Sequence, residues 1–550
     1  MRMEKLAEFG DGKMRKIKLL DCTLRDGSYI NASMFGEPAL KGIIKKMQEA
    51  GIDIIECGWL KDTPHQIGSA YFHVPSDMER YLLERSNQCT YVAMIDWDRY
   101  NTDNLPKCDN KSINAIRVVF PKGKVKEGVK VAQRIREKGY LVYLQAANTL
   151  GYSDEELEEL VTYVNEFKPV AISVVDTFGA MYFEDLEHIV SFLDERLDSS
   201  IQLGFHSHNN QQLSFALTMN FVELLRDGQR DVVVDASLSG MGRGAGNATT
   251  ELVANYLNKK LHGNYDMNAI LDAIDMYIDG FKENFTWGYS TPYFIAGMYQ
   301  CHVNNIAYLR KNHRTNSRDM RNVIASLGVE ERRHYDYDLL EKRYMENQDR
   351  LVDDEQDKRK LKEILSGRKV LLLAPGKSIT DEEAAIKKFI SLENPVVIGV
   401  NAILPHYVYD YLFFVNNIRY DYAEEAYGEK FKATKKILLS NISTTATEND
   451  FVINFNTAIK RGWEHFDNAV ICALRLLGRL ETKEVILAGF DGFKTKYNES
   501  YADASLPTLN PGNDWDGLNE EIKNMFQDVK LSLGDKMSIK FLTKSIFDGA

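Results

Sequence analysis

The chain has 550 residues, too many for one hydrophobic core, and this length predicts two or three domains. Lys and Arg number 68 against 80 Asp and Glu, and the net charge of −12 argues against nucleic acid or an anionic membrane as the main partner. The six cysteines form no CxxC pair, the N-terminus has no apolar signal segment, and no apolar run approaches the ~18 residues of a membrane span. These features predict a cytoplasmic protein with reduced thiols.

Apolar runs of strand length recur through the first half of the chain. They are near-continuous rather than alternating, as in strands that a parallel sheet buries on both faces. The eight runs cover residues 17–23, 53–60, 90–96, 115–120, 141–148, 171–177, 201–208 and 231–238. Most gaps between them hold an amphipathic helical pattern. Eight β-α units over about 240 residues predict a TIM (β/α)8 barrel for residues 15–262, and an open doubly wound sheet is the alternative.

Two further regions follow the predicted barrel. Residues 263–365 carry helical patterns and predict a helical extension and linker. From residue 366 to 550 the strand pattern returns, beginning with RKVLLLAPGKSI, and it predicts a Rossmann-like α/β domain.

Two distant motifs predict a metal site in the barrel. Asp26 follows the first strand in the stretch LRDGSY, and FHSHNN places His206 and His208 at the end of the seventh. Residues i and i+2 of a strand face the same side, and the carboxyl ends of barrel strands meet at one face. Two histidines and one carboxylate form a known divalent-metal arrangement. The alternative is a hydrogen-bonded histidine pair and an unrelated turn aspartate.

Other polar residues stand at predicted strand ends on the same face. They are Glu56, Asn148, Asp176 and Thr177. The stretch GMGRGAGN follows the eighth strand and ends in Asn247. Its glycines would let the backbone approach a ligand, or would simply supply positive φ in a tight turn.

The motifs DCTLRDGSY, VVDTFGAM, HSHNN and DASLSGMGRGAGNA resemble those of the DRE-TIM metallolyases. This superfamily includes 4-hydroxy-2-oxovalerate aldolase and 3-hydroxy-3-methylglutaryl-CoA lyase, and the similarity is greatest to the aldolase branch. The resemblance covers about residues 17–260.

The resemblance implies a role for each matching position. Asp26, His206 and His208 would bind Mn²⁺ or Mg²⁺, with Asn247 as a further ligand. Arg25 would stabilise the charge of an enolate beside the metal. The implied catalytic residues are Arg25, Tyr29 and Asp176, and the implied substrate-binding residues are Glu56, Asn148 and Thr177.

Tyr29 departs from the family pattern. In bacterial aldolases that resemble this chain, a histidine at the matching position serves as the general base. A phenol with a pKa near 10 is a poor base near neutrality, so Tyr29 would bind substrate or act as an acid. His65, after the second strand, and a metal-bound hydroxide are the other candidates for the base.

The C-terminal region resembles bacterial sialyltransferases that use CMP-activated sugars, although more faintly. The resemblance implies nucleotide binding by Gly376, Ser378, Asn401 and Asp491. The turn is Gly-Lys-Ser here, and it is not a P-loop because the earlier glycine of that motif is Leu371. A strand–turn–helix without a ligand is the alternative.

These observations predict a metal-dependent aldolase that joins the enolate of a 2-oxo acid, by default pyruvate, to an aldehyde. The pairing of two domains suggests a role in making a sugar acid or a surface polysaccharide. The alternatives are a Claisen-type acyltransferase or acyl-CoA lyase, and a metal-binding scaffold without activity. The apolar stretch YFIAGMYQC would suit a homo-oligomer contact, and nothing indicates a partner dehydrogenase.

Overall fold

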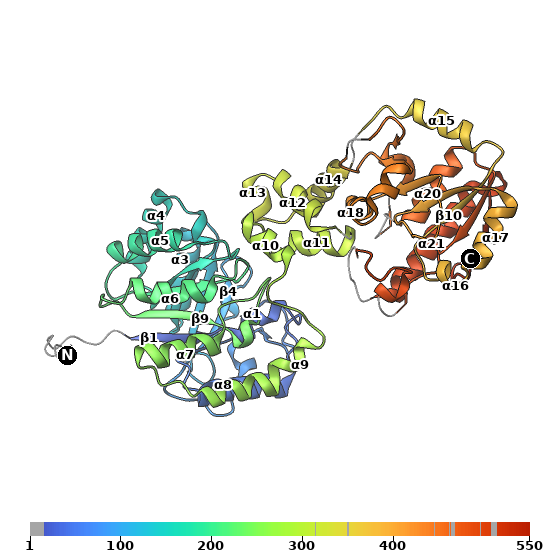
Figure 1. Cartoon of the computed structure of the whole chain (residues 1–550). Coiled ribbons are helices and arrows are strands. Elements are labelled where there is room, and N and C mark those ends of the chain that lie inside the picture. Colours follow the sequence, from blue (N-terminus) through green and yellow to red (C-terminus); the bar gives the residue numbers. More distant parts are fainter. Residues whose placement is uncertain are drawn as a thin grey trace, which may run out of the picture. The chain divides into compact units, whose positions relative to one another are not determined.

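The structure is a computed structural model that describes residues 16–313, 315–348, 351–444, 446–460, 462–463, 468–494, 497–507 and 514–549. Contacts divide the chain into two compact units, Met1–Val303 and Asn304–Ala550. Both units contain a parallel sheet covered by helices (Figure 1).

The first unit is a closed barrel of eight parallel strands. Its strands are β1 Ile17–Asp21, β2 Ile54–Leu60, β4 Thr90–Asp96, β5 Ala115–Phe120, β6 Leu141–Ala146, β7 Ala171–Asp176, β8 Gln202–Ser207 and β9 Val232–Ala236. Pairing of β1 with both β9 and β2 closes the sheet, and the two-residue strand β3 (Tyr71–Phe72) pairs in parallel with the last two residues of β2. The TIM barrel predicted from the sequence is therefore confirmed.

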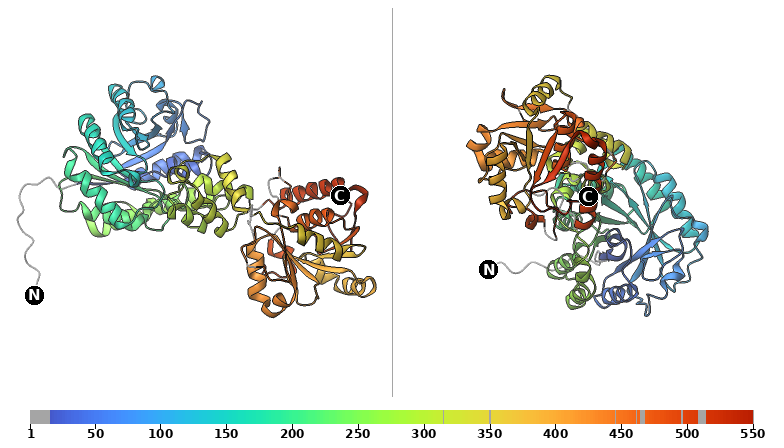
Figure 2. Two further views of the ribbon diagram at one scale, coloured as in Figure 1. Left: turned by 90° about the horizontal axis from the view of Figure 1, so that it is seen from above. Right: turned by 90° about the vertical axis from the view of Figure 1, so that its right-hand side faces the viewer.

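Helices surround the strands, as two further views show (Figure 2). They are α2 Glu37–Glu49, α3 Val125–Glu137, α4 Asp154–Phe167, α5 Phe183–Arg196, α6 Ser214–Leu224, α7 Thr250–Leu261 and α8 Met267–Ala273, followed by α9 Asp279–Lys282 and α10 Thr291–Met298. The connections after β2 and β4 contain only short 3₁₀ turns at Pro75–Met78 and Thr102–Asn104. Two of the eight units therefore lack the α-helix of a regular barrel.

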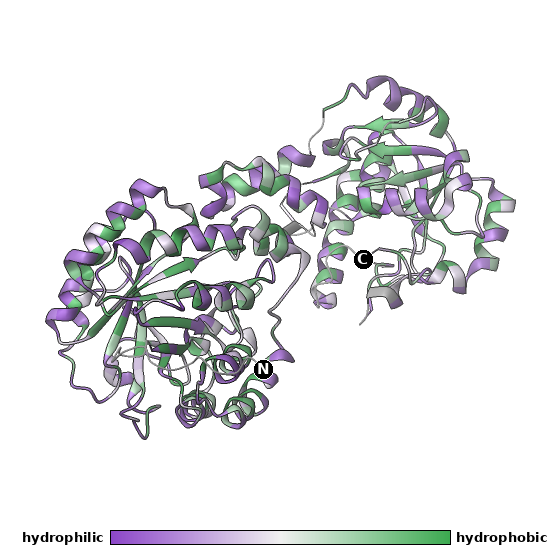
Figure 3. Cartoon of the chain, turned by 60° about the vertical axis from the view of Figure 1, so that its left-hand side comes forward, coloured by the Kyte–Doolittle hydropathy of each residue, from purple (hydrophilic) through white to green (hydrophobic). Residues whose placement is uncertain are grey.

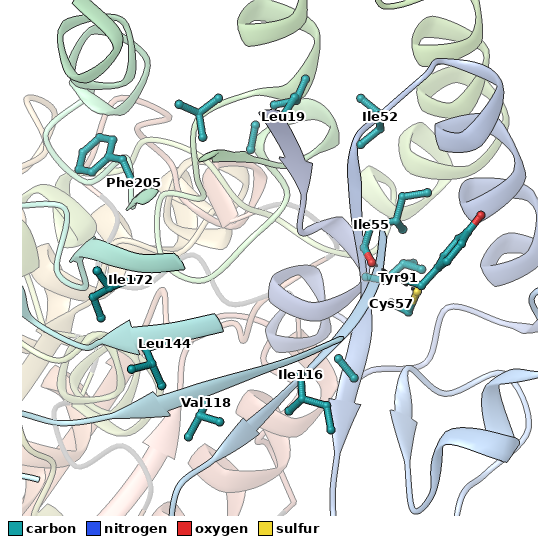
Figure 4. Packing of buried hydrophobic residues seen from close by; sticks show 14 of the residues in the cluster. Leu19, Ile52, Ile55, Cys57, Tyr91, Ile116, Val118, Leu144, Ile172 and Phe205 are labelled. Atoms are coloured by element: carbon teal, nitrogen blue, oxygen red, sulfur yellow. Dashed lines mark hydrogen bonds between the residues drawn. The ribbon is translucent and has the colours of Figure 1, made fainter. Parts of the chain in front are cut away.

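Alternation along the strands separates two sets of apolar side chains. One set, including Leu19, Ile116, Leu144, Ile172 and Phe205, packs outward against the helices (Figure 4). Their sequence neighbours fill the barrel interior: Leu20, Ile54, Val92, Ala115, Tyr143, Ala171 and Val233. Because strands rather than helices lie at the centre of the unit, they are the most uniformly hydrophobic elements (Figure 3).

A polar layer lies two residues further along the same strands and faces the same interior. It consists of Glu56, Arg117, Gln145, Ser173, His206 and Asp235, all of them buried. The barrel thus has an apolar floor and a charged layer immediately below its carboxyl-terminal mouth.

A β-bulge in β2 changes the direction of its last residues. Glu56 pairs with Val92 and Trp59 with Met94, so three steps on β2 match two on β4. Gly58 adopts a φ of +146°, and a Cβ there would lie 2.1 Å from the carbonyl oxygen of Ala70. The extra residue lets Glu56 and Trp59 both reach Arg25, although three-residue spacing would normally place them on opposite faces.

The second unit begins with five helices and continues as an α/β domain. The helices are α11 Val303–His313, α12 Ser317–Ser326, α13 Val329–Arg333, α14 Tyr337–Gln348 and α15 Glu355–Leu365. Seven parallel strands follow: β10 Lys369–Leu373, β11 Val396–Val400, β12 Tyr411–Phe414, β13 Lys435–Leu439, β14 Phe451–Ile453, β15 Glu484–Ala488 and β16 Ser538–Phe541. The helices between them are α16 Ser378–Asp381, α17 Glu383–Glu393, α18 Asn417–Ala433, α19 Phe455–Ala458, α20 Ala469–Arg479 and α21 Trp515–Leu533.

The strand order of this sheet is β14-β13-β12-β11-β10-β15-β16. The chain first winds outward from β10 in one direction and then returns to the other side of β10 with β15. The order therefore reverses between β10 and β15, where open α/β sheets bind ligands beyond the carboxyl ends of their strands. No helix in the described part of the chain is long and apolar enough to cross a membrane.

Candidate active site

The loop after β1 brings Asp26 to the barrel mouth. The buried carboxylate of Asp21, at the end of β1, accepts hydrogen bonds from the Thr23 amide and the Thr250 hydroxyl. These contacts fix the start of the short helix α1 (Thr23–Asp26). The predicted metal ligand Asp26 ends this helix and is 1% exposed.

The three predicted ligands come together. One donor atom from each of Asp26, His206 and His208 lies within 4.8 Å of the other two. Nε2 of His208 lies 3.5 Å from Oδ2 of Asp26. A single cation between them could reach all three side chains through small rotamer changes.

The other nitrogen of each imidazole faces a fixed oxygen. Nδ1 of His208 is 3.1 Å from the carbonyl oxygen of Asp176, and Nδ1 of His206 is 3.0 Å from Oδ2 of Asp235. At His208 this contact places the proton on Nδ1 and leaves Nε2 as a lone-pair donor, the arrangement usual for metal-binding histidines. Nδ1 of His206 lies near Asp235 but makes no hydrogen bond within the described chain. Burial lowers the pKa of His206, which keeps this imidazole neutral despite Asp235.

Two buried acceptor atoms without hydrogen-bond partners support a cation site between Asp26 and the two histidines. Within the described chain, neither Nε2 of His208 nor Oδ1 of Asn247 has a hydrogen-bond partner, and both atoms are buried. Nδ2 of Asn247 donates to Oδ2 of Asp26 over 2.6 Å. A Cβ at Gly242 would lie 2.5 Å from that amide nitrogen, so the glycine-rich loop can approach this closely only with glycine there. The residues present therefore fit a divalent cation.

Alternating charges extend from the mouth into the barrel. Nε of Arg25 donates to Oε2 of Glu56 over 2.8 Å, and Nη1 of Arg25 donates to Asp26 over 2.6 Å. Arg117 lies on the other side of Glu56, at 3.1 Å, and its Nη2 donates to Asp235 over 2.5 Å. These five groups carry three negative and two positive charges. A divalent cation would compensate the remaining negative charge.

The charged groups around Asp26 set its protonation state. Burial by itself would raise the pKa of this carboxyl group, but Arg25 and the two histidines outweigh it and hold the pKa of Asp26 well below its usual value. Asp26 is therefore ionised near neutral pH, as a metal ligand must be.

Tyr29 lies at the mouth, between Trp59 and Arg243. Its ring makes an edge contact with Trp59 at 6.2 Å between centroids, and the guanidinium carbon of Arg243 lies 5.0 Å from its centroid. Tyr29 is 44% exposed, and its partial desolvation raises the pKa of the phenol above its ordinary value, an effect that the positive charges of Arg243 and Arg25 only partly offset. The phenol stays protonated near neutrality and can donate a hydrogen bond.

The remaining predicted residues have mostly local partners. The carboxylate of Asp176 accepts from the amides of Ala180 and Met181, so it orders the loop after β7 while its carbonyl oxygen faces His208. The hydroxyl of Thr177 accepts from the amide of Asn148 over 2.7 Å.

His65 stands apart from the metal ligands. Its Nδ1 is 2.7 Å from the carbonyl oxygen of Tyr71, and its Nε2 is 2.9 Å from the hydroxyl of Tyr81. Both nitrogens hold the loop between β2 and β4, so neither is available as a base.

The C-terminal domain has a cavity of about 110 Å³ at the point where its strand order reverses. Gly376, Asn401 and Asp491 line it, as does the buried Arg419. Ser378 instead donates to Asp491 through both its amide and its hydroxyl, at 2.7 and 2.5 Å.

Packing alone accounts for glycine at position 376, in the turn after β10. A Cβ at Gly376 would lie 2.3 Å from the carbonyl oxygen of Gly489. The turn after β10 therefore lies directly against the turn after β15, whatever the cavity binds.

Sequence reasoning missed three residues that complete these sites. Arg117 was visible as a lone charge within the apolar run AIRVVF, which is unusual for a buried strand unless the charge is paired. Arg243 was visible as the one charged residue of GMGRGAGN. No sequence pattern indicated Arg419, because it lies in the first turn of a helix rich in charged residues, α18.

Comparison with known proteins adds independent observations. A family model described as HMGL-like matches residues 119–276. The 4-hydroxy-2-oxovalerate aldolase of Thermomicrobium roseum is 28% identical over 274 residues, which are 48% of this chain and 72% of that protein. The 4-hydroxy-2-oxovalerate aldolase 2 of Salinispora arenicola is 27% identical over 325 residues, which are 57% of this chain and 89% of that protein. Among solved structures, the HMG-CoA lyase of Bacillus subtilis is 17% identical with a TM-score of 0.40, covering 49% of this chain and 95% of that one.

Proposed function

We propose, because the barrel unit belongs to the DRE-TIM metallolyase superfamily, that this protein is a divalent-metal-dependent aldolase that acts on a 2-oxo acid. The observation that carries the proposal is the convergence of Asp26, His206 and His208 within 4.8 Å. The default reaction joins C3 of pyruvate to the carbonyl carbon of an aldehyde. The C3 proton is lost and the aldehyde oxygen gains one, so no other reactant is consumed.

Asp26, His206 and His208 would hold the cation, with Asn247 as a further ligand. When bound, Mn²⁺ or Mg²⁺ would act as a Lewis acid that stabilises the enolate charge. Arg25 adds a second positive charge that is always present, because guanidinium groups do not deprotonate in proteins. Its contacts with Glu56 and Asp26 fix its position before substrate binds, so no reorganisation is needed as charge develops.

Tyr29 would donate a hydrogen bond to the oxygen that was the aldehyde carbonyl. Its raised pKa suits this role, since the phenol keeps its proton throughout the neutral range. The partners of Asp176, Thr177 and Asn148 indicate positioning of the loops after β6 and β7 rather than contact with the reacting atoms.

Pyruvate C3 proton exchange tests the proposal directly, because exchange needs only enolate formation. We expect the Mn²⁺-loaded protein to exchange the methyl protons of pyruvate into deuterated water, as followed by NMR, and to release pyruvate from 4-hydroxy-2-oxo acids. A protein that binds Mn²⁺ but does neither would be a scaffold. Thiol release from acyl-CoA without exchange would indicate the acyl-CoA lyase or acyltransferase alternative.

For the C-terminal domain we propose a phosphorylated ligand, namely a nucleotide or nucleotide-activated sugar. Two observations support it: the cavity lies at the reversal of strand order, and the buried guanidinium of Arg419 lines it. Such a ligand would be consistent with a role in making sugar acids for surface polysaccharides.

Calorimetry with CMP, UDP and the matching nucleosides tests this second proposal. We expect Arg419→Gln to weaken nucleotide binding at least about 10-fold, the contribution of one hydrogen bond between charged groups. The exposed Arg368→Gln is the matched control. Equal affinity for nucleoside and nucleotide, or no binding of either, would contradict it.

A further inference from the structure

A cavity of about 320 Å³ opens at the barrel mouth above β2 and β4. Tyr29 and Trp59 are among the residues that line it. The indole nitrogen of Trp59 donates to the carbonyl oxygen of Arg25 over 3.2 Å, and the Arg25 guanidinium carbon lies 5.9 Å from the Trp59 ring. Arg25 in turn donates to Asp26, so the contacts Trp59–Arg25–Asp26 link the cavity wall to the candidate metal ligands, none of which lines the cavity itself.

Aromatic rings and carboxylates share the lining. Tyr29, Trp59 and Tyr71 present ring surfaces, and Asp62 and Asp96 present acceptor oxygens. Aromatic rings suit the C–H faces of a carbohydrate, and carboxylates accept hydrogen bonds from hydroxyl groups. The combination favours a ligand that carries several hydroxyls.

The carboxylates of Asp62 and Asp96 differ in the hydrogen bonds that they already accept from the protein. Asp62 accepts hydrogen bonds from the amide of Asn101 and the side chain of Asn104, at 2.9 and 3.0 Å. Asp96 has Arg99 at 3.8 Å, and burial raises the pKa of its carboxyl group. A ligand hydroxyl that donates a hydrogen bond would therefore stabilise the carboxylate of Asp96 more than that of Asp62.

The charges of the lining cancel. Lys61 and Arg99 are positive, and Asp62 and Asp96 are negative. Nζ of Lys61 lies 3.4 Å from the centre of the Tyr71 ring, and the exposed guanidinium of Arg99 lies 3.8 Å from Asp96. A neutral ligand needs no further charge compensation from this lining.

We infer that this cavity binds the aldehyde half of the substrate, and that the aldehyde is neutral and polyhydroxylated, as an aldose is. The inference rests on the proposed aldolase function for its chemistry and on the cavity lining for its selectivity. The 2-oxo acid would occupy the metal centre, and the hydroxylated chain would lie against Trp59 and Tyr29 with its hydroxyls on Asp62 and Asp96.

Aldol addition of pyruvate to erythrose and to butanal tests the inference, since both aldehydes have four carbons. With rates normalised to the free carbonyl fraction, we expect kcat/KM for erythrose to exceed that for butanal at least about 10-fold, the effect of one hydrogen bond to a charged acceptor. The double variant Asp62→Asn/Asp96→Asn should reduce this ratio toward one. Asp98→Asn, an exposed neighbour outside the lining, should leave the ratio unchanged. Equal rates for the two aldehydes, or a preference for glyceraldehyde 3-phosphate, would overturn the inference.

Saturation-transfer NMR with erythritol separates this inference from the proposed reaction, because the alditol cannot react. We expect erythritol to bind the oxalate- and Mn²⁺-loaded wild type and Asp98→Asn, but not the double variant. If pyruvate exchange is absent while this pattern holds, the hydroxylated-ligand site stands and the aldolase proposal fails. If erythritol binds all three proteins equally or none of them, the site is rejected.

Discussion

Asp26→Asn should lower the Mn²⁺ affinity and the pyruvate exchange rate each by at least about 100-fold, because residues that merely orient metal ligands already contribute about 10–100-fold. The substitution keeps the shape of the side chain but removes the charge that faces His208 and Arg25. Free Mn²⁺ measured by electron paramagnetic resonance gives the affinity, and NMR gives the exchange rate.

The exposed Asp98→Asn is the matched control for this variant and should retain both properties. Hydrogen exchange of the barrel peptides would verify that Asp26→Asn is folded. An Mn²⁺ affinity equal to that of the wild type would show that the three side chains do not form the metal centre, and the proposed function would fall with it.

Arg117→Met should destabilise the barrel by about 3–5 kcal/mol, the usual cost of removing one partner from a buried ion pair. Arg117 lies between Glu56 and Asp235, and none of the three is more than 2% exposed. Removing the guanidinium leaves two carboxylates close together with Arg25 and His206 as their remaining partners. Water cannot reach them to offset the loss.

Hydrogen–deuterium exchange by mass spectrometry measures this cost for the barrel alone. Protection factors of β5 and β9 should fall about 10²–10⁴-fold, since 1.4 kcal/mol corresponds to a factor of 10. Peptides of the C-terminal domain act as an internal reference within the same sample. Arg134→Met, an exposed substitution on α3, should change neither set. Barrel protection within threefold of the wild type would show that the network is not needed for stability.

The convergence of the three candidate metal ligands could be predicted from the sequence because it is local or follows from the fold. HxH spacing places His206 and His208 on one face, and the barrel brings Asp26 to the same mouth. The barrel itself was visible in eight buried strands. The connections after β2 and β4 depart from the predicted eight β-α units, since neither contains an α-helix; Pro64 and Pro75 lie in the first of them and Pro106 in the second.

The partners of the site residues could not be predicted in the same way. Whether Glu56 meets Arg25, Arg117 or a ligand depends on strand register and on the bulge in β2, which no pattern reports. Ser378 and Asp491 are 113 positions apart, and only the return of β15 beside β10 shows that they bond to each other. The two loop amides that donate to the Asp176 carboxylate likewise follow from the course of the loop after β7, which no sequence pattern reports.

The β-bulge at Gly58 in β2 links the charge layer of the barrel to the cavity at its mouth. Glu56 belongs to the charge layer and Trp59 to the mouth cavity, and both touch Arg25 only because an additional residue separates them. In a regular strand the three-residue spacing would turn the indole away from Arg25, so deleting one residue at the bulge would uncouple the cavity wall from the charge layer.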